Sequence, residues 1–584
     1  MADPAWNADL PKIREDYDRA RKLIDKDSLL DPPTEPYRSK YKAREILKEL
    51  LEVIGSDEAA AELSRRALVR ALLKYDLGTI AADTEELSLG QEYFEDGLKI
   101  IGEDRYEDPR CCMLAIHLLN QLGILYSGRE DKTKARDILK RAEKLYANIK
   151  ARDDARVHDF TDYFLPEGEQ PCSNTTEKNF EKAFIHTLYY LAQVYEALED
   201  AEMSAVYCHS TLKRQLATDD FDSVDWALNA ATLSQFFIVR GDFNAGRHHL
   251  ACASFIMEQY RDKLDKEELL PEELEGKQET LKHRSADIAR CWAKNGLLLL
   301  CASKEALLKL KDETGNDNSS NKKEERKKPH ILISSEQILA YEKSVTDEPV
   351  TDFEGARPIF LSAQKWLNEA KEYYTLKEHA SDYIKITQES SKLYSALIAF
   401  EEAPDRQCKM HKRRIDILEE VLKEVSPKYY VNECRQILFE LGETYSEMAD
   451  IKFSQLPGAV QPQSHPVKKI NSLIDKAVKN FSGFLETLHD SEKRLPSRLP
   501  DDYVRPALLA HFCIGRLSTR RVASDPRDQI ENYKTAQEYY DYVIDYCKRH
   551  PDHAPQVETE LEVVKELVEL IPGMIQNCLG TVMY

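Results

Sequence analysis

Residues Leu119–Tyr126 read LNQLGILY, and this stretch decides the interpretation of the whole chain. Its largest apolar residues and its glycine recur at helical spacing, at Leu119, Leu122, Gly123 and Tyr126. Residues three and four apart lie on one face of an α-helix, so the stretch predicts a helix with one apolar face. A glycine in the middle of that face indicates that another helix approaches closely there, because any side chain would hold the two apart.

A second helix is predicted a few polar residues later, with Leu139 between two small residues, Ala135 and Ala142. The order of large, small and aromatic residues over the two helices is typical of a tetratricopeptide repeat, a helical hairpin of about 34 residues. One hairpin cannot bury its own apolar face, so the motif predicts neighbours stacked upon it. The pattern recurs, with variations, within residues 77–97, 186–212, 230–253 and 438–488.

The chain as a whole is predicted to be all-α, a solenoid of eight or nine tetratricopeptide-like hairpins, because no segment longer than four residues alternates like a strand. We expect four parts: a solenoid over residues 1–278, a long helix over 279–311, a flexible loop over 312–348 and a second solenoid over 349–584. A polar connection near residues 152–177 is expected to be a long loop or a short added helix. A capping helix is expected from Val557 to Ile571, with Pro572 ending it.

The composition excludes several classes of protein. A net charge of −22 disfavours nucleic acid as the partner, because the phosphate backbone would be repelled, and favours a basic protein. The acidic N-terminus does not resemble a signal peptide, and the longest apolar run, Leu297–Ala302, is too short to cross a bilayer. Twelve unevenly spaced cysteines are typical of buried residues in a reducing compartment. We therefore expect a cytoplasmic protein that does not insert into membranes.

No motif for catalysis, nucleotide binding or metal binding is found, so we expect no catalytic residue and no cofactor. Possible metal ligands are densest at Cys208-His209 and at His248-His249-Cys252. Their spacing matches no zinc pattern, which favours half-buried positions between helices over a structural zinc site.

The first helix of each hairpin commonly lines the concave face of such repeats, and that face commonly holds a peptide or a helix. No lysine or arginine stands at the corresponding positions here, which argues against a clamp for acidic peptides. We expect a polar, neutral groove, and the alternative that some of its polar residues are merely solvated remains open. The candidate partner-binding residues are His117, Asn120, His186, Tyr189, Gln193, Gln235, Gln436 and Glu443.

One basic run, KMHKRR at Lys409–Arg414, breaks the acidic trend. Such a run is usually a solvated face or pairs with neighbouring repeats. A local recognition patch is the less favoured alternative.

Several stretches together resemble one family, the kinesin-binding proteins. They are NQLGILYS (120–127), HTLYYLAQVY (186–195), CHSTLKRQL (208–216), WALNAATLSQF (226–236), IARCW (288–292), CKMHKRRI (408–415), VKKIN (467–471), RPALLAHF (505–512) and DYCKRHP (545–551). The resemblance implies two right-handed solenoids joined by the long helix at 279–311. It also implies that a concave surface captures kinesin motor domains by the face that they use on microtubules, without catalysis.

Capture of this kind would regulate microtubule-based transport and neuronal differentiation, in the cytoplasm and in association with the cytoskeleton. Other cytoskeletal proteins are possible further partners. The charge agrees with this mechanism: tubulin is acidic, the motor's track-binding face is basic, and a protein at −22 can compete for it. The alternative is a general scaffold or co-chaperone built on the same repeats.

Overall fold

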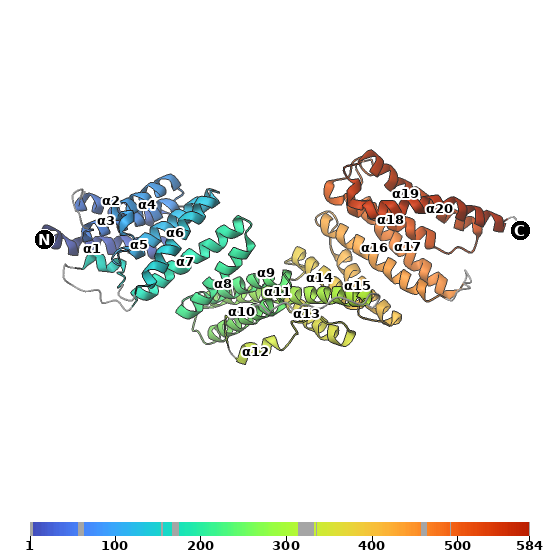
Figure 1. The fold of residues 1–584 in the computed structure, drawn as a ribbon, viewed down its shortest axis with the longest axis horizontal. Helices are drawn as coiled ribbons and strands as arrows, with labels where there is room; N and C mark the ends of the chain where they lie inside the picture. Colours follow the sequence, from blue (N-terminus) through green and yellow to red (C-terminus); the bar gives the residue numbers. More distant parts are fainter. Residues whose placement is uncertain are drawn as a thin grey trace. The chain divides into compact units, whose positions relative to one another are not determined.

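The computed structural model describes residues 4–55, 63–152, 156–165, 175–313, 332–334, 336–456, 464–490 and 492–582. Within these ranges every regular element is a helix, 20 of them α-helices, and no strand is present (Figure 1). The all-α solenoid class predicted from the sequence is confirmed. None of the described helices combines the length and the apolar character that a membrane span requires.

The chain divides into two compact units, residues 1–236 and 237–584, and the division lies inside α9 (Ser223–Val239). The division expected at residues 278 and 279 stays a prediction. The long helix expected over 279–311 is α11 (Pro271–Glu313), and it lies within the second unit. It begins earlier than expected, with a proline at its first position and two glutamates in its first turn, both of which suit a helix N-terminus.

The first unit contains four helical hairpins. Their helices are α1 (Pro4–Asp25), α2 (Arg38–Ile54), α3 (Arg65–Asp83), α4 (Leu87–Ile101), α5 (Cys112–Gly128), α6 (Lys132–Lys150), α7 (Thr176–Ala197) and α8 (Ala201–Thr218). Each odd-numbered helix packs against the next even-numbered helix, which in turn contacts the first helix of the following hairpin. The first helices α3, α5 and α7 also contact one another in succession, as expected for a solenoid.

The second unit repeats this arrangement. Its helices are α10 (Phe243–Leu264), α11, α12 (Glu336–Glu342), α13 (Phe353–Tyr373), α14 (Ala380–Ile398), α15 (Pro404–Glu424), α16 (Val431–Ser454), α17 (His465–Glu486), α18 (Val504–Arg520), α19 (Pro526–Arg549) and α20 (Glu558–Val582). Helices α14 to α19 form three hairpins, and α11 packs against α10, α13 and α14. The described ranges also contain five 3-10 helices, three in the first unit and two in the second: η1 (Asp27–Leu30), η2 (Glu103–Arg105), η3 (Phe160–Phe164), η4 (Asp501–Tyr503) and η5 (Ala554–Val557).

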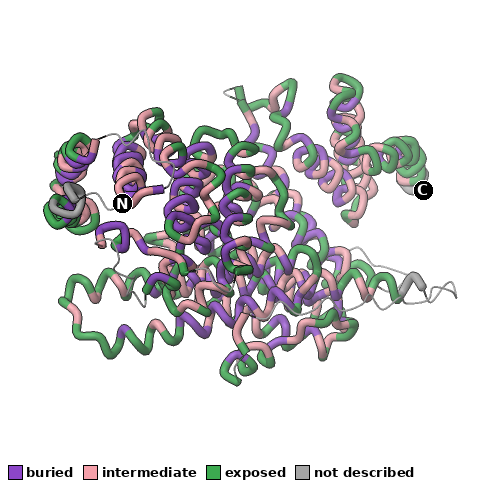
Figure 2. Tube along the Cα trace, turned by 60° about the vertical axis from the view of Figure 1, so that its left-hand side comes forward, coloured by how far each residue is buried: buried purple, intermediate pink, exposed green. Residues whose placement is uncertain are grey.

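Close helix approach explains the glycines of the repeat. A Cβ atom added to Gly123 would lie 2.6 Å from Cγ of Leu139, on the second helix of the same hairpin. The same relation holds for Gly78 with Phe94, for Gly442 with Phe481 and for Gly515 with Tyr540. The seams predicted from the glycine positions are therefore present in both units. Figure 2 shows the result: buried residues follow one side of most helices, and exposed residues follow the other.

Two further expectations are resolved by the described residues. The connection after α6 contains the short helix η3, whose Phe164 ring stacks on Tyr17 at a centroid distance of 4.8 Å. The prediction that Pro572 ends the last helix is wrong, because α20 continues to Val582. Pro572 is exposed and Ile571 beside it is 1% exposed, so the ring faces solvent while the apolar face continues.

Most of the loop expected over 312–348 lies outside the described residues, but its last part contains α12. Side chains of α10 hold this segment. His248 Nδ1 lies 2.7 Å from the Glu342 carboxylate, and Arg247 donates to the backbone oxygen of Val345 at 2.8 Å.

Candidate partner-binding site

A groove of about 310 Å³ opens in the first unit between α7, α8 and α9. Two rows of side chains at helical spacing form its walls: Tyr189, Gln193 and Glu196 on α7, and Asn229, Thr232 and Phe236 on α9. Small residues of α8, among them Ala201, Ser204 and Ala205, also line the groove. These small side chains leave space between the two walls. We call this site the inner groove.

The chemistry of the inner groove is polar and almost neutral. Among the described residues that line it, Glu196 is the only charged one. The side-chain amides of Gln193 and Asn229 have no hydrogen-bond partner within the described part of the chain, and Oε1 of Gln215 is buried without one. Buried polar groups in native proteins are nearly always hydrogen-bonded, so an orphan acceptor beside free amides marks a place where a partner can complete the bonding.

Tyr189 and Gln193 lie together in the inner groove, as expected for two candidates one helical turn apart. The Tyr189 side chain is 40% exposed and contacts the Tyr190 ring edge-on at a centroid distance of 5.3 Å. Cys208 also lines the groove, but burial, together with the charge of Glu196, raises the pKa of its thiol to about 11. The thiol is therefore protonated at neutral pH and is a poor nucleophile.

His186 lies one turn before Tyr189 on α7 and is exposed. Desolvation lowers the pKa of its imidazole, and the nearby ammonium of Lys182 lowers it further. The ring is therefore neutral at physiological pH and presents a hydrogen-bonding group without charge.

Asn120 lies inside the unit rather than on a free surface. Its side chain is 4% exposed, donates to the backbone oxygen of Ala183 at 2.9 Å and accepts from the hydroxyl of Thr187 at 2.9 Å. These bonds join α5 to α7, the first helices of consecutive hairpins. Asn120 thus sets the spacing of the helices behind the inner groove.

His117, also on α5, is held between aromatic rings. Its ring contacts Tyr75 and Phe160 edge-on at centroid distances of 5.6 and 5.2 Å. Burial, with the charges of His186 and Arg21, lowers the pKa of His117 to about 4, so the ring is neutral. Like Asn120, it is used by contacts within the unit.

The candidate on α9, Gln235, does not line the groove. Gln235 is half-buried and donates to the hydroxyl of Ser234 at 3.0 Å, while its own oxygen is buried without a partner. The residues that line the inner groove from α9 are Asn229, Thr232, Leu233 and Phe236, and none of them was among the candidates predicted from the sequence. Their spacing of three and four residues was the available signal, since it marks one face of the helix.

Two candidates lie in the second unit, on α16. Gln436 is exposed and accepts a hydrogen bond from Gln388 of α14 at 3.2 Å. Glu443 is also exposed. Partial desolvation of its carboxyl group, together with the negative charges of Glu447 and Glu440, raises its pKa to about 7. The positive charge of Arg414 opposes this shift but does not cancel it.

The basic run at Lys409–Arg414 divides into buried and exposed side chains. Arg414 is buried and pairs with Glu447 at 2.8 Å and with Glu440 at 3.7 Å. His411 is buried beside it, and burial is the main cause that lowers its pKa to about 4. Arg414 therefore pairs with the neighbouring repeat, as the favoured interpretation expected for this part of the run.

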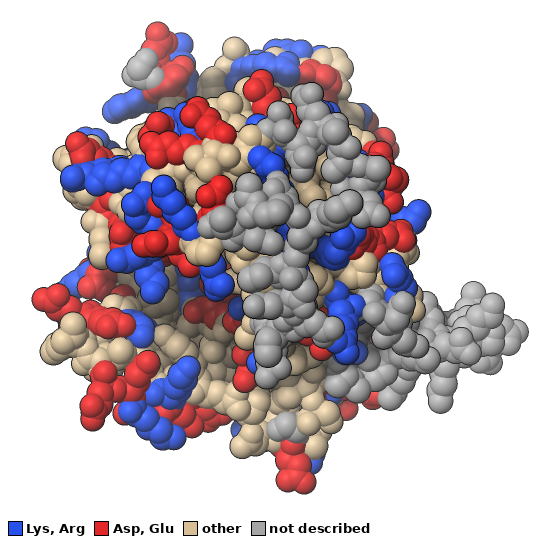
Figure 3. Space-filling model, turned by 90° about the vertical axis from the view of Figure 1, so that its left-hand side faces the viewer, with Lys and Arg blue, Asp and Glu red and all other residues tan. Residues whose placement is uncertain are grey.

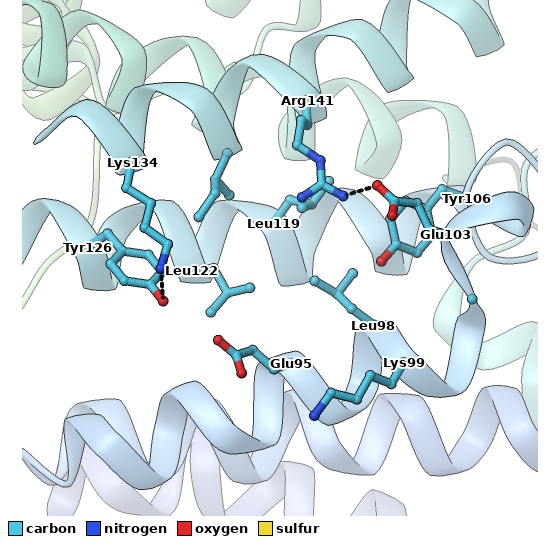
Figure 4. A pocket seen from close by; sticks show the side chains of 12 residues that line it. Glu95, Leu98, Lys99, Glu103, Tyr106, Leu119, Leu122, Tyr126, Lys134 and Arg141 are labelled. Atoms are coloured by element: carbon cyan, nitrogen blue, oxygen red, sulfur yellow. Dashed lines mark hydrogen bonds and ion pairs between the residues drawn. The ribbon is translucent and has the colours of Figure 1, made fainter. Parts of the chain in front are cut away.

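A second groove, of about 510 Å³, lies over α4, α5 and α6 of the first unit and has an apolar floor that includes Leu98, Leu119 and Leu122. Figure 4 shows that internal pairs occupy the charged groups at its ends. Arg141 pairs with Glu103 at 2.6 Å, and Lys134 donates to the hydroxyl of Tyr126 at 2.8 Å. These groups already have partners, so this groove is a weaker candidate than the inner groove.

The possible zinc ligands serve other purposes. Both ring nitrogens of His248 are engaged, one with Glu342 and the other with the backbone N–H of Leu332 at 2.9 Å. No group of three or more histidine, cysteine and acidic side chains suited to a metal ion occurs in the described ranges.

Charges of both signs are interspersed on the face shown in Figure 3, so the net charge there is not gathered into one acidic patch.

The stacked hairpins and the polar groove define a helical-repeat protein of the kind that presents a binding surface. Residues 224–578 match the family model described as KIF-1 binding protein C terminal. The chain is 41% identical to the KIF-binding protein of Gallus gallus over 99% of this chain and 98% of that one. It is 36% identical to the Homo sapiens protein over 99% of each chain, and 32% identical to the Drosophila melanogaster protein over 97% of each.

The chain therefore belongs to the family of KIF-binding proteins, and the resemblance noted in the sequence is confirmed. A solved structure titled as the cryo-EM structure of the KIFBP core is 32% identical. The match covers 52% of this chain and 94% of that one, with a TM-score of 0.35.

Proposed function

We propose that this protein binds kinesin motor domains in the inner groove, holds them off the microtubule and acts by binding alone, without catalysis. The relatives' names support a kinesin partner. The observation that carries the choice of surface is the group of unpartnered amides, Gln193, Asn229 and Gln215, around an exposed tyrosine. Such groups can pair with the polar side chains and backbone ends of a motor helix or loop.

The near-neutral lining supports a division of roles. Long-range attraction between an acidic protein and the basic track-binding face of a motor raises the rate of encounter, while hydrogen bonds in the groove select the partner. A motor held by that face cannot also hold the track. We propose that the protein thereby regulates microtubule-based transport and neuronal differentiation from the cytoplasm, in association with the cytoskeleton.

The test replaces Tyr189 and Gln193 together by alanine in the full chain. The double variant should lose at least tenfold in affinity for an isolated kinesin motor domain, because it removes an aromatic anchor and a free amide, each of which typically contributes about 1–3 kcal/mol at an interface. It should also fail to release motor from microtubules in a co-sedimentation assay.

Tyr41→Ala is the matched control, because it removes a tyrosine of similar exposure (41%) from α2, outside the groove. It should bind and compete like the parent. If the double variant binds motors as tightly as the parent and melts at the same temperature, the inner groove is not part of the contact surface. Failure of the parent itself to bind any motor in a panel would overturn the proposed function.

A further inference from the structure

The last helix, α20, carries an apolar row that the fold does not cover. Val563, Leu570 and Met574 are 40%, 56% and 37% exposed, and Leu567 between them is half-buried. Their spacing of four, three and four residues puts them in one row along the helix. We call this row the outer stripe. The coil beside the C label in Figure 2 is coloured largely as exposed.

The outer stripe lies beside the face by which α20 packs on its own unit, and Leu567 contacts the core of that unit as well. Val564 and Ile571 are 0% and 1% exposed and, with Leu561, Val568 and Ile575, belong to the core of the second unit. The helix therefore has two apolar rows: the packing within the unit uses all of one row but only Leu567 of the other, and it leaves Val563, Leu570 and Met574 uncovered. Exposed apolar side chains aligned in one row on a helix indicate a surface on which another element can pack.

A row of acidic side chains runs beside the outer stripe. Glu562, Glu566 and Glu569 are exposed, and none of them has an ion-pair partner among the described residues. By contrast, Glu560, on the side towards α18, pairs with Arg505 at 3.0 Å. The surface thus combines one apolar row and one acidic row that has no ion pair among the described residues.

We infer that the outer stripe is a docking site for an amphipathic helix of another protein whose apolar row is bordered by lysine or arginine. Such a helix would pack its apolar row against Val563, Leu570 and Met574 and place its cations beside the glutamates. A second copy of this chain fits less well. An antiparallel two-fold pair of α20 helices, centred midway between Val563 and Met574, would bring Glu569 near the same residue of the other copy, and like charges there repel.

The experiment uses the full chain and two synthetic 18-residue amphipathic helices with the same leucine row. One peptide has lysines beside the leucines and the other has glutamates. Fluorescence anisotropy should show at least tenfold tighter binding of the lysine peptide. The double variant Glu562→Lys and Glu566→Lys should reverse this preference, because it changes the sign of the charges beside the stripe.

Leu570→Glu separates apolar contact from general attraction between a basic peptide and an acidic protein. This substitution adds a negative charge, which by itself would attract the lysine peptide. It should nevertheless weaken binding of that peptide at least tenfold, because it removes the apolar side chain at the centre of the stripe. Leu308→Glu, a matched change at a leucine of α11 that is 52% exposed, should bind like the parent. Val563→Glu gives an independent second measurement at the other end of the row.

Three outcomes would overturn the inference: equal binding of the two peptides, parental binding by Leu570→Glu and Val563→Glu, or a preference unchanged by the lysine substitutions. A parent that is dimeric by light scattering and becomes monomeric on Leu570→Glu would overturn it as well, by assigning the stripe to a second copy. The motor-binding test does not involve α20, so either proposal can fail without the other.

Discussion

Gly123 shows how one residue type follows from the distance between two helices. The absence of a side chain there lets the Leu139 side chain enter the space, and Leu139 is itself completely buried. The sequence revealed this seam because glycine inside an otherwise apolar helix costs stability unless the packing requires it.

Gly123→Leu should lower the free energy of unfolding by about 1–3 kcal/mol, because it overpacks a filled seam. Urea unfolding followed by circular dichroism measures the change. Gly128→Ala, on the same helix with no atom within 4 Å of the added Cβ, should cause no loss. Equal stabilities of Gly123→Leu and the parent would show that the seam can open without cost.

Glu443 makes the stability of the second unit depend on pH. Its pKa in the folded chain is raised to about 7, above its value in the unfolded chain, so folding favours the protonated form. The stabilising effect of that proton is complete at low pH and is lost as the pH rises towards and through 7.

Glu443→Gln, which is neutral at every pH, should therefore melt at a higher temperature than the parent, by a larger margin at pH 8 than at pH 5. Thermal unfolding of both proteins at the two pH values measures this. A difference in melting temperature that is the same at pH 5 and pH 8 would show that the carboxyl group does not titrate in this range.

At the scale of helices, the sequence predicted most elements, because each hairpin carries its own pattern of large and small residues. The sequence predicted the ends of helices less well. Pro572 was expected to stop α20, but a proline whose ring faces solvent costs one hydrogen bond and leaves the buried row intact. Helix α12 was missed because it is short and has no periodic pattern of its own; it is held by a contact from another helix, between His248 of α10 and Glu342.

The candidate site could be predicted in part, for a related reason. Tyr189 and Gln193 were placed on the groove by repeat register, and both line it. Asn120 has the same repeat position on α5, yet it is buried beneath α7, because which helix covers which is decided by contacts 63 to 67 residues apart in the chain. A repeat pattern gives the face of a helix but not the neighbour that closes over it.

For the molecule as a whole, the net charge of −22 should govern the rate of capture. Motor affinity should fall on the order of tenfold as monovalent salt rises from about 50 mM to 200 mM, because salt screens attraction between charges that are not in contact. Affinity for one motor domain, measured at several salt concentrations, checks this. The Tyr189 and Gln193 double variant should bind more weakly at each concentration but keep the parental salt dependence. An affinity that does not change with salt would exclude the electrostatic contribution.

The order of packing in the first unit has a consequence for synthesis of the protein. Helices α3 to α8 contact the α-helices next to them in sequence or one hairpin away. The packing of one hairpin on another therefore does not require an α-helix that is made much later. Each hairpin can settle on its predecessor soon after it leaves the ribosome, while the rest of the chain is still being translated. Most apolar faces are then covered in the order in which they are made, which limits their exposure to chaperones and to aggregation; Tyr17 of α1 is an exception, because its stacking partner Phe164 is made much later.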